Sequence, residues 1–268
     1  MIDESTTCYR HPDRLAAVAC QRCERPICTD CMSQASVGHH CPECVAGYSQ
    51  TVHTADSLMN APTQVTKTLI AANVAAFVVQ LASADRFTNW GILFGPFVEA
   101  GDLWRILVSG FLHGSLLHIG FNMYALWIFG PTLERGVGAF RFGLIYVTSL
   151  LGGSLAVLAF NFGQPTLGAS GAVLGLAGGI AGVLMTRGVN VFRTSLGSIF
   201  LINLALPLLV PRISFWGHLG GIAAGFVAGL LLTWLPERAK QSQAIAVAVT
   251  SAFVLALLVA NFAVAGVV

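Results

Sequence analysis

The sequence predicts an all-α polytopic membrane protein with a small cysteine-rich domain at its N-terminus, and three observations support this prediction. Only 10% of the 268 residues are charged, whereas soluble domains carry about 25%. Apolar residues make up 55% of the chain, and the mean hydropathy is +0.74. All seven cysteines lie in the first 45 residues. Such a composition excludes a disordered chain, which would be poor in apolar residues, and argues against a water-soluble enzyme.

Charge and cysteine content divide the chain near residue 67. Residues 1–67 hold 12 of the 26 charged residues, and residues 68–268 hold 14 charged residues and no cysteine. The net charge is only +2 and no basic run alternates with aromatic residues, so we expect no nucleic-acid partner. Asp3 and Glu4 lie where a secretory signal would be cationic, so the first segment is expected to be cytoplasmic.

Residues 1–45 contain four pairs of metal-ligating residues with two residues inside each pair. The pairs are Cys8 with His11, Cys20 with Cys23, Cys28 with Cys31, and Cys41 with Cys44. Eight such ligands predict two structural Zn²⁺ sites and leave no open position for catalysis. Disulfides are the alternative, but seven cysteines is an odd number and the cytoplasm is reducing. His39 or His40, beside Cys41, could replace one thiolate.

Seven apolar stretches follow a polar linker at residues 46–64. A bilayer core of about 30 Å needs roughly 20 apolar residues in a helix. The predicted spans are 66–84, 114–133, 141–162, 169–186, 196–211, 214–235 and 243–265. The fifth is the weakest, because Pro207 interrupts a short segment. The connection 85–113 is rich in aromatic residues and is expected to lie in the membrane interface.

The basic residues of the short loops predict the orientation in the membrane. With a cytoplasmic N-terminus, the inner loops hold Arg135, Arg141, Arg187, Arg193, Arg238 and Lys240. The outer loops then hold only Arg86, Arg105 and Arg212. We therefore expect a multi-pass protein of the cell membrane with an extracytoplasmic C-terminus.

Five polar side chains lie at the outer ends of the second, fourth and sixth spans. They are His113, His118, Asn122, Ser170 and His218. Polar and ionisable groups are costly inside a membrane, so each of these residues is a candidate functional residue. Because these three spans run in the same direction, the five side chains share one depth.

Glycines bring two of these helices together. The sixth span has glycine at 217, 221, 225 and 229, and the fourth has it at 171, 175 and 179. Rows of small residues let helices approach closely in lipid, so Ser170 and His218 are expected to meet. A serine activated by a histidine base is the arrangement of a serine hydrolase. No acidic residue lies at this depth, so a dyad is predicted rather than a triad. His118, Asn122 and the Ser170 backbone N–H are candidate oxyanion donors.

At these residues the chain resembles the rhomboid family of intramembrane serine proteases. The matching pieces are Trp104-Arg105, His113, His118 with Asn122, Glu134-Arg135, Gly168-Ala-Ser170-Gly171, and His218 with Gly221 and Gly225. The resemblance implies a six-helix core over residues 65–236 and cleavage of transmembrane segments near the extracytoplasmic face. The additional C-terminal transmembrane helix within 237–268 lies outside this core, although a six-plus-one arrangement occurs in the family.

The same resemblance implies the role of each residue. Ser170 would be the nucleophile and His218 the base, with the oxyanion bound by His118, Asn122 and the Ser170 N–H. His113 would support that site, Trp104 and Arg105 the interfacial loop, and Glu134 the inner end of the second span. Some members place an aromatic ring against the base where this chain has Leu174. The cysteine domain resembles B-box cross-brace fingers, in which pairs one and three share one ion and pairs two and four share the other.

Two other functions fit parts of the pattern. One is a catalytically inactive rhomboid-like protein that binds and escorts membrane proteins, with the zinc domain as a site for a cytoplasmic protein partner. The presence of both Ser170 and His218 favours the protease. The other is a small transporter or channel, which would need polar residues further toward the inner leaflet. We expect transmembrane protein substrates and the lipid bilayer as partners.

Overall fold

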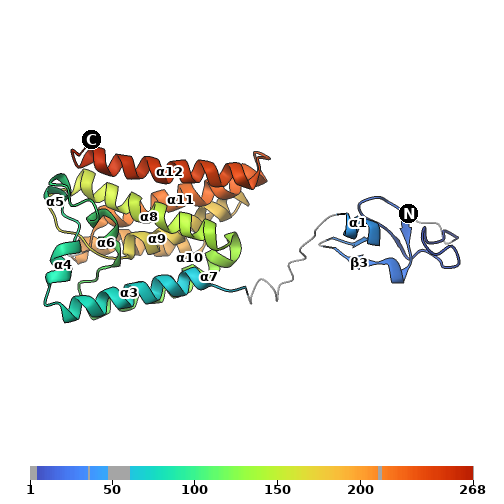
Figure 1. Cartoon of the computed structure of the whole chain (residues 1–268), viewed down its shortest axis with the longest axis horizontal. Coiled ribbons are helices and arrows are strands. Elements are labelled where there is room, and N and C mark those ends of the chain that lie inside the picture. Colours follow the sequence, from blue (N-terminus) through green and yellow to red (C-terminus); the bar gives the residue numbers. More distant parts are fainter. Residues whose placement is uncertain (1–4, 36, 48–60, 211–212, 268) are drawn as a thin grey trace. The chain divides into compact units, whose positions relative to one another are not determined.

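The computed structural model describes residues 5–35, 37–47, 61–210 and 213–267. The chain divides into two compact units, Met1–Ala61 and Pro62–Val268, and each is described by itself (Figure 1). Most of the predicted linker, at residues 48–60, lies outside the described residues.

The first unit is built from two small antiparallel sheets. Strand β1 (Val18–Ala19) pairs with β2 (Pro26–Ile27), and β3 (Ser33–Gln34) pairs with β4 (His39–His40). A 3-10 turn, η1 (Thr29–Cys31), and a short helix, α1 (Pro42–Ala46), complete it. Its buried apolar cluster consists of Ile27 and five cysteines. A core this small provides little hydrophobic stabilisation, so the unit depends on interactions of its cysteines.

Among the described residues of the second unit, seven long helices lie at the seven predicted stretches (Figure 1). They are α3 (Gln64–Ala82), α7 (Leu116–Val137), α8 (Ala139–Phe160), α9 (Ser170–Thr186), α10 (Ser195–Leu209), α11 (Phe215–Glu237) and α12 (Gln243–Val264). By length and composition, α3, α8, α11 and α12 can cross a membrane. A fifth span results if α7 is taken together with Arg105–Phe111, from which it is bent by 92°, while α9 and α10 are shorter apolar helices. The chain is a multi-pass membrane protein.

The connection between α3 and α7 folds into short helices. They are α4 (Arg86–Gly91), α5 (Gly95–Glu99), α6 (Arg105–Val108) and the 3-10 turn η2 (Ser109–Phe111). Trp90 and Trp104 stack with ring centroids 5.7 Å apart. The aromatic residues of this connection thus pack on one another, and the connection joins the ends of α3 and α7 as an ordered segment.

Helices α8, α9 and α11 pack side by side and form the centre of the bundle (Figure 1). The glycine rows of α9 and α11 face each other. A Cβ added at Gly221 would lie 2.1 Å from the Gly171 carbonyl oxygen, and one at Gly225 would lie 2.0 Å from that of Gly175. The two helices therefore touch backbone to backbone, as the glycine spacing predicts.

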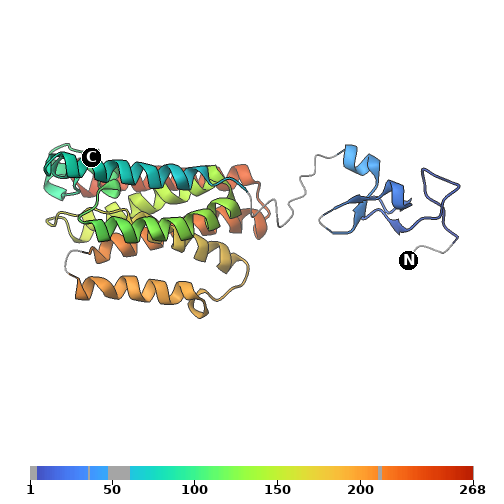
Figure 2. The same ribbon diagram turned by 90° about the horizontal axis from the view of Figure 1, so that it is seen from below.

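Helix α10 lies at the edge of the bundle (Figure 2). Of its residues, only Leu196 is buried. This helix is therefore held by much less apolar contact than α8, α9 or α11.

Candidate functional site

Ser170 and His218 lie within hydrogen-bonding distance. The His218 Nε2 and the Ser170 Oγ are 2.9 Å apart. Ser170 is the first residue of α9, and His218 lies in the first turn of α11, where it is only 3% exposed. The close approach of Gly171 and Gly221 sets this distance, because both glycines lie within one helical turn of the two side chains. The two side chains can exchange a proton directly.

The second ring nitrogen of His218 is also bonded. Its Nδ1 lies 3.0 Å from the backbone carbonyl oxygen of Asn203 on α10. A carbonyl only accepts hydrogen bonds, so Nδ1 carries the proton and Nε2 is left as the acceptor. The Ser170 hydroxyl can therefore donate to Nε2, which is the arrangement that a general base requires.

His118 and Gly168 border the same small space as Ser170. A Cβ added at Gly168 would lie 2.8–2.9 Å from the Cε1 and Nε2 of His118 and 3.6 Å from Ser170 Oγ. Gly168 has φ +134°, a conformation that residues with a side chain disfavour. Glycine is therefore required here both by the backbone conformation and by the lack of space for a Cβ. The His118 Nδ1 accepts a long bond of 3.4 Å from the Gly114 N–H, which leaves its Nε2 as a donor near Ser170.

Asn122 makes a different contact from the one expected. Its Nδ2 donates to the carbonyl oxygen of His118 at 3.0 Å, within α7. The side chain is buried one turn beyond His118. Its amide therefore has to leave this bond, or share it, in order to reach an oxyanion.

His113 is buried behind His118. The two rings meet edge to face with centroids 5.1 Å apart, and among the described residues neither ring nitrogen of His113 has a hydrogen-bond partner. Gln80 of α3 clamps the backbone of His113: its Oε1 accepts from the His113 N–H at 2.8 Å, and its Nε2 donates to the His113 carbonyl at 3.2 Å. We did not predict Gln80 from the sequence, although a buried amide in an apolar span was a signal that could have identified it.

Trp104 and Arg105 hold the interfacial connection together. The guanidinium of Arg105 is bonded to the Asp102 carboxylate at 2.8–2.9 Å and to the carbonyls of Asn89 and Ile92 at 2.7 and 3.0 Å. Trp104 Nε1 donates to the Trp90 carbonyl at 3.1 Å. One buried cation thus joins the end of α4 to the turn before α6.

Glu134, near the end of α7, caps the start of α3. Its carboxylate accepts from the N–H groups of Val65 and Thr66 at 2.9 and 2.8 Å, and from the Thr66 hydroxyl at 2.6 Å. The first amides of a helix have no partner within it, and a negative charge there is favourable. Glu134 is only 2% exposed, so this cap is a buried contact between α3 and α7.

The eight predicted metal ligands form two separate groups. One contains Cys8, His11, Cys28 and Cys31, and the other contains Cys20, Cys23, Cys41 and Cys44. In each group the ligand atoms lie within 4.8 Å of one another. The cross-brace pairing that the resemblance implied is therefore present in the structure, and neither group includes His39 or His40.

The spacing and the protonation of these thiols fit a metal ion. A tetrahedral site with Zn–S bonds of about 2.3 Å has sulfurs about 3.8 Å apart, and Cys23 Sγ and Cys41 Sγ are separated by 3.7 Å. Burial raises the pKa of Cys20, but surrounding backbone N–H groups outweigh it and lower this pKa to about 6. Burial and neighbouring thiols raise the pKa of Cys44 to about 12. A divalent cation would remove this mutual penalty, since metal coordination deprotonates thiols. Each group could hold one metal ion.

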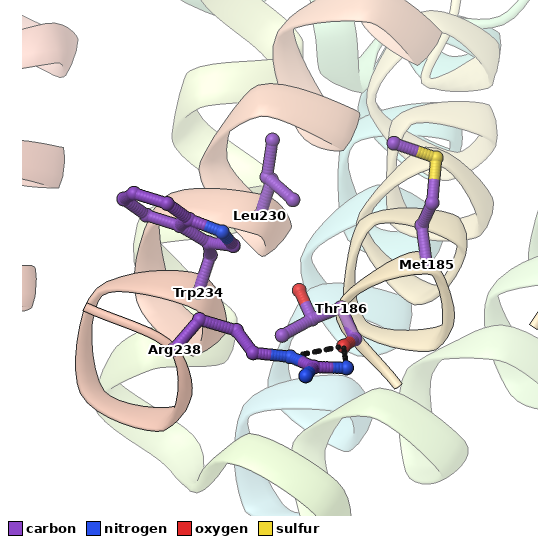
Figure 3. A pocket seen from close by; sticks show the side chains of 5 residues that line it. All are labelled: Met185, Thr186, Leu230, Trp234 and Arg238. Atoms are coloured by element: carbon purple, nitrogen blue, oxygen red, sulfur yellow. Dashed lines mark hydrogen bonds between the residues drawn. The ribbon is translucent and has the colours of Figure 1, made fainter. Parts of the chain in front are cut away.

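An open pocket of about 570 Å³ lies at the other ends of α9 and α11. Its lining residues are Met185, Thr186, Leu230, Trp234 and Arg238. The Arg238 guanidinium donates to the Thr186 carbonyl at 2.9 and 3.1 Å (Figure 3). This contact satisfies a carbonyl at the end of α9, so Arg238 serves the helix terminus.

Known proteins are similar to this chain over part of its length. A family model described as the Rhomboid domain matches residues 100–235. The chain is 36% identical over 146 residues to "RHOMBOID-like protein 6, mitochondrial" of Arabidopsis thaliana, covering 52% of this chain and 47% of that protein. It is 33% identical over 163 residues to "Rhomboid protease GluP" of Bacillus subtilis (strain 168), covering 58% and 32%. With "Rhomboid-related protein 3" of Homo sapiens the identity is 30% over 203 residues, covering 68% and 50%. The chain thus spans about a third to a half of the length of these curated relatives.

Proposed function

Since this chain belongs to the rhomboid family, we propose that it is an intramembrane serine endopeptidase that cleaves transmembrane segments of other proteins near the extracytoplasmic face. Ser170 is the nucleophile and His218 is the general base. The observation that carries this proposal is the 2.9 Å contact between His218 Nε2 and Ser170 Oγ.

The reaction follows from the protonation of the two side chains. The Ser170 Oγ attacks the scissile carbonyl carbon while His218 Nε2 takes the hydroxyl proton, and His218 then gives this proton to the leaving amine. Water then attacks the acyl-enzyme carbonyl while His218 Nε2 takes its proton; the ester bond to Ser170 Oγ breaks, and His218 returns the proton to that oxygen. Proton transfer of this kind contributes about 10²- to 10⁴-fold to the rate.

The oxyanion of the tetrahedral intermediate needs donors on the opposite side of the carbon from the base. The Ser170 N–H belongs to the first turn of α9, where backbone amides are unpaired and the helix dipole favours negative charge. The His118 Nε2, beside Gly168, supplies a second donor, and Asn122 is proposed as a third. The ring nitrogens of His113 have no hydrogen-bond partner within the described part of the chain, and the ring packs against His118, so His113 is proposed to support His118 and a water molecule beside it.

Substrate selection follows from helix chemistry. A transmembrane helix shields its peptide bonds by internal hydrogen bonds, so a substrate has to unwind locally before Ser170 can attack. We therefore propose substrates with small or helix-weakening residues close to the extracytoplasmic face.

The N-terminal domain, residues 1–45, is proposed to bind two structural Zn²⁺ ions through its two cysteine and histidine groups. We propose that this domain and the linker 46–64 are cytoplasmic, that residues 65–236 form the protease core, and that the C-terminal helix in 237–268 ends outside the cytoplasm. A cytoplasmic protein is the proposed partner of the zinc domain.

The test is cleavage of a membrane-anchored substrate by the purified protein in detergent. Wild type, Ser170→Ala and His218→Ala are compared, with Ser251→Ala in α12 as a matched control. We expect cleavage by wild type and Ser251→Ala and none above background by the other two. Cleavage that survives Ser170→Ala would refute the nucleophile. An intact substrate that co-purifies with wild type, without labelling of Ser170 by a fluorophosphonate, would instead support the escort protein.

A further inference from the structure

We propose that the backbone carbonyl of Asn203, which Pro207 leaves without its helical donor, orients the His218 imidazole, so that α10 contributes a positioning residue to the dyad. This inference rests on the proposed function and adds to it a third group, which is main chain rather than side chain.

The contact has the geometry of an orienting hydrogen bond. His218 Nδ1 and Asn203 O are 3.0 Å apart, and His218 Nε2 and Ser170 Oγ are 2.9 Å apart. The imidazole is thus held at both nitrogens, with its proton on the side away from Ser170. In a catalytic triad a buried carboxylate fixes the same tautomer. The sequence has no Asp or Glu between Glu134 and Glu237, so no acidic side chain from α8 to α10 could do this.

The carbonyl of Asn203 is available because of the residue four positions later. In an α-helix each carbonyl accepts a hydrogen bond from the N–H of residue i+4. For Asn203 that residue is Pro207, which lies inside α10 and has no N–H. A carbonyl without a partner in a place shielded from water costs about 1–3 kcal/mol, and Asn203 is half-buried. The hydrogen bond from the His218 Nδ1–H removes this cost. Pro207 thus leaves the carbonyl free to accept, and His218 supplies the missing donor.

The side chain of Asn203 is not the orienting group. Its Nδ2 donates to the Ile199 carbonyl at 2.9 Å, back along α10. The residue at position 203 can therefore change without loss of the carbonyl. Leu174, one turn into α9 after Ser170, provides no aromatic ring to stack on the imidazole.

The decisive comparison is between two variants of position 207 that carry the same methyl side chain and differ only in the backbone N–H. Pro207→Ala introduces an N–H that competes with His218 for the Asn203 carbonyl. Lactic acid at 207, incorporated by nonsense suppression, has the same methyl group but an ester oxygen in place of the N–H. Pro131→Ala in α7 is the control for removing a proline from another helix of the bundle. Removal of a helix-interior proline favours the helix, so these variants should fold.

Three readouts separate orientation from substrate entry. For Pro207→Ala we expect kcat for a membrane substrate to fall about 10-fold or more with little change in KM. The rate of Ser170 labelling by a small water-soluble fluorophosphonate should fall by the same factor. In ¹⁵N NMR spectra, the His218 signal, assigned by its loss in His218→Ala, should no longer be purely that of the Nδ1–H tautomer. Lactic acid at 207, Asn203→Ala and Pro131→Ala should all resemble wild type.

Each other outcome overturns the inference in a recognisable way. Labelling of Pro207→Ala at the wild-type rate would show that the carbonyl does not control the base. Equal losses in the alanine and lactic acid variants would assign the effect to the proline ring instead of the missing donor. If Ser170→Ala still cleaves substrate, the proposed function fails. The NMR comparison then still decides the orientation, since an unchanged Nδ1–H signal in Pro207→Ala would contradict it.

Discussion

Replacement of Gly221 by alanine should separate Ser170 from His218 without changing either side chain chemically. The new Cβ would lie 2.1 Å from the Gly171 carbonyl oxygen, and real contacts of this kind are not shorter than 3.0 Å. The two backbones must therefore move apart by about 0.9 Å, the difference of these distances. Applied along the dyad, this shift would lengthen the 2.9 Å bond between Ser170 and His218 to about 3.8 Å, beyond hydrogen-bonding range. Misplacement by about 1 Å can cost 10²-fold in rate.

The assay is the initial rate of Ser170 labelling by a fluorophosphonate, together with kcat for a membrane substrate. Gly143→Ala is the matched control, because a Cβ there meets no atom within 4 Å, and alanine should stabilise α8 by about 0.5–1 kcal/mol. We expect Gly221→Ala to lose about 100-fold in both rates and Gly143→Ala to lose nothing. If folded Gly221→Ala reacts within about threefold of wild type, the backbone contact does not set the dyad distance.

Three further variants test the supporting contacts. Glu134→Ala removes the acceptor of three hydrogen bonds from α3, so the unfolding free energy in detergent should fall by about 2–4 kcal/mol; a loss no larger than that of the exposed Glu99→Ala would contradict the cap. Cys20→Ser removes one ligand of the second cysteine group, so metal analysis should give fewer than two zinc ions per chain. The control His39→Ala should keep two. Two ions in Cys20→Ser would refute the eight-ligand scheme. Arg105→Lys replaces three nitrogens in a planar fork by a single ammonium nitrogen, which cannot reach the carboxylate and both carbonyls in their present positions. Amide hydrogen exchange in residues 86–111 should therefore accelerate, and unchanged exchange would show that the guanidinium is not needed.

The positions of the helices were predictable because apolar length and glycine spacing are local properties of the sequence. Helix α11 begins at Phe215, one residue from its predicted start, and the Gly221 row faces the Gly171 row as its period requires. Helix α3 begins at Gln64, two residues before the predicted start. The reason is tertiary: Glu134, almost 70 residues later, satisfies amides that could not otherwise begin the helix so early.

The meeting of Ser170 and His218 was predictable from topology, but their supporting contacts were not. The group of Asn203 proposed to act is its backbone carbonyl, which every residue has. In the sequence, this carbonyl is distinguished only by Pro207, four residues later, which has no N–H to donate to it. Gln80 supports His113 through two backbone bonds that depend on how α3 lies against the segment before α7. The dyad, the oxyanion donors and the zinc assignment stay predictions until the assays above are made.

Helices α9 and α11 touch main chain to main chain at Gly171, Gly221 and Gly229. Ordinary cores adapt to mutation by repacking, since a smaller residue on one element can make room for a larger one on its neighbour. Compensating changes of side-chain size are not possible where two main chains are in contact. For the proposed protease, we therefore expect changes in substrate preference to arise on the outer helices, while the spacing of α9 and α11 stays fixed.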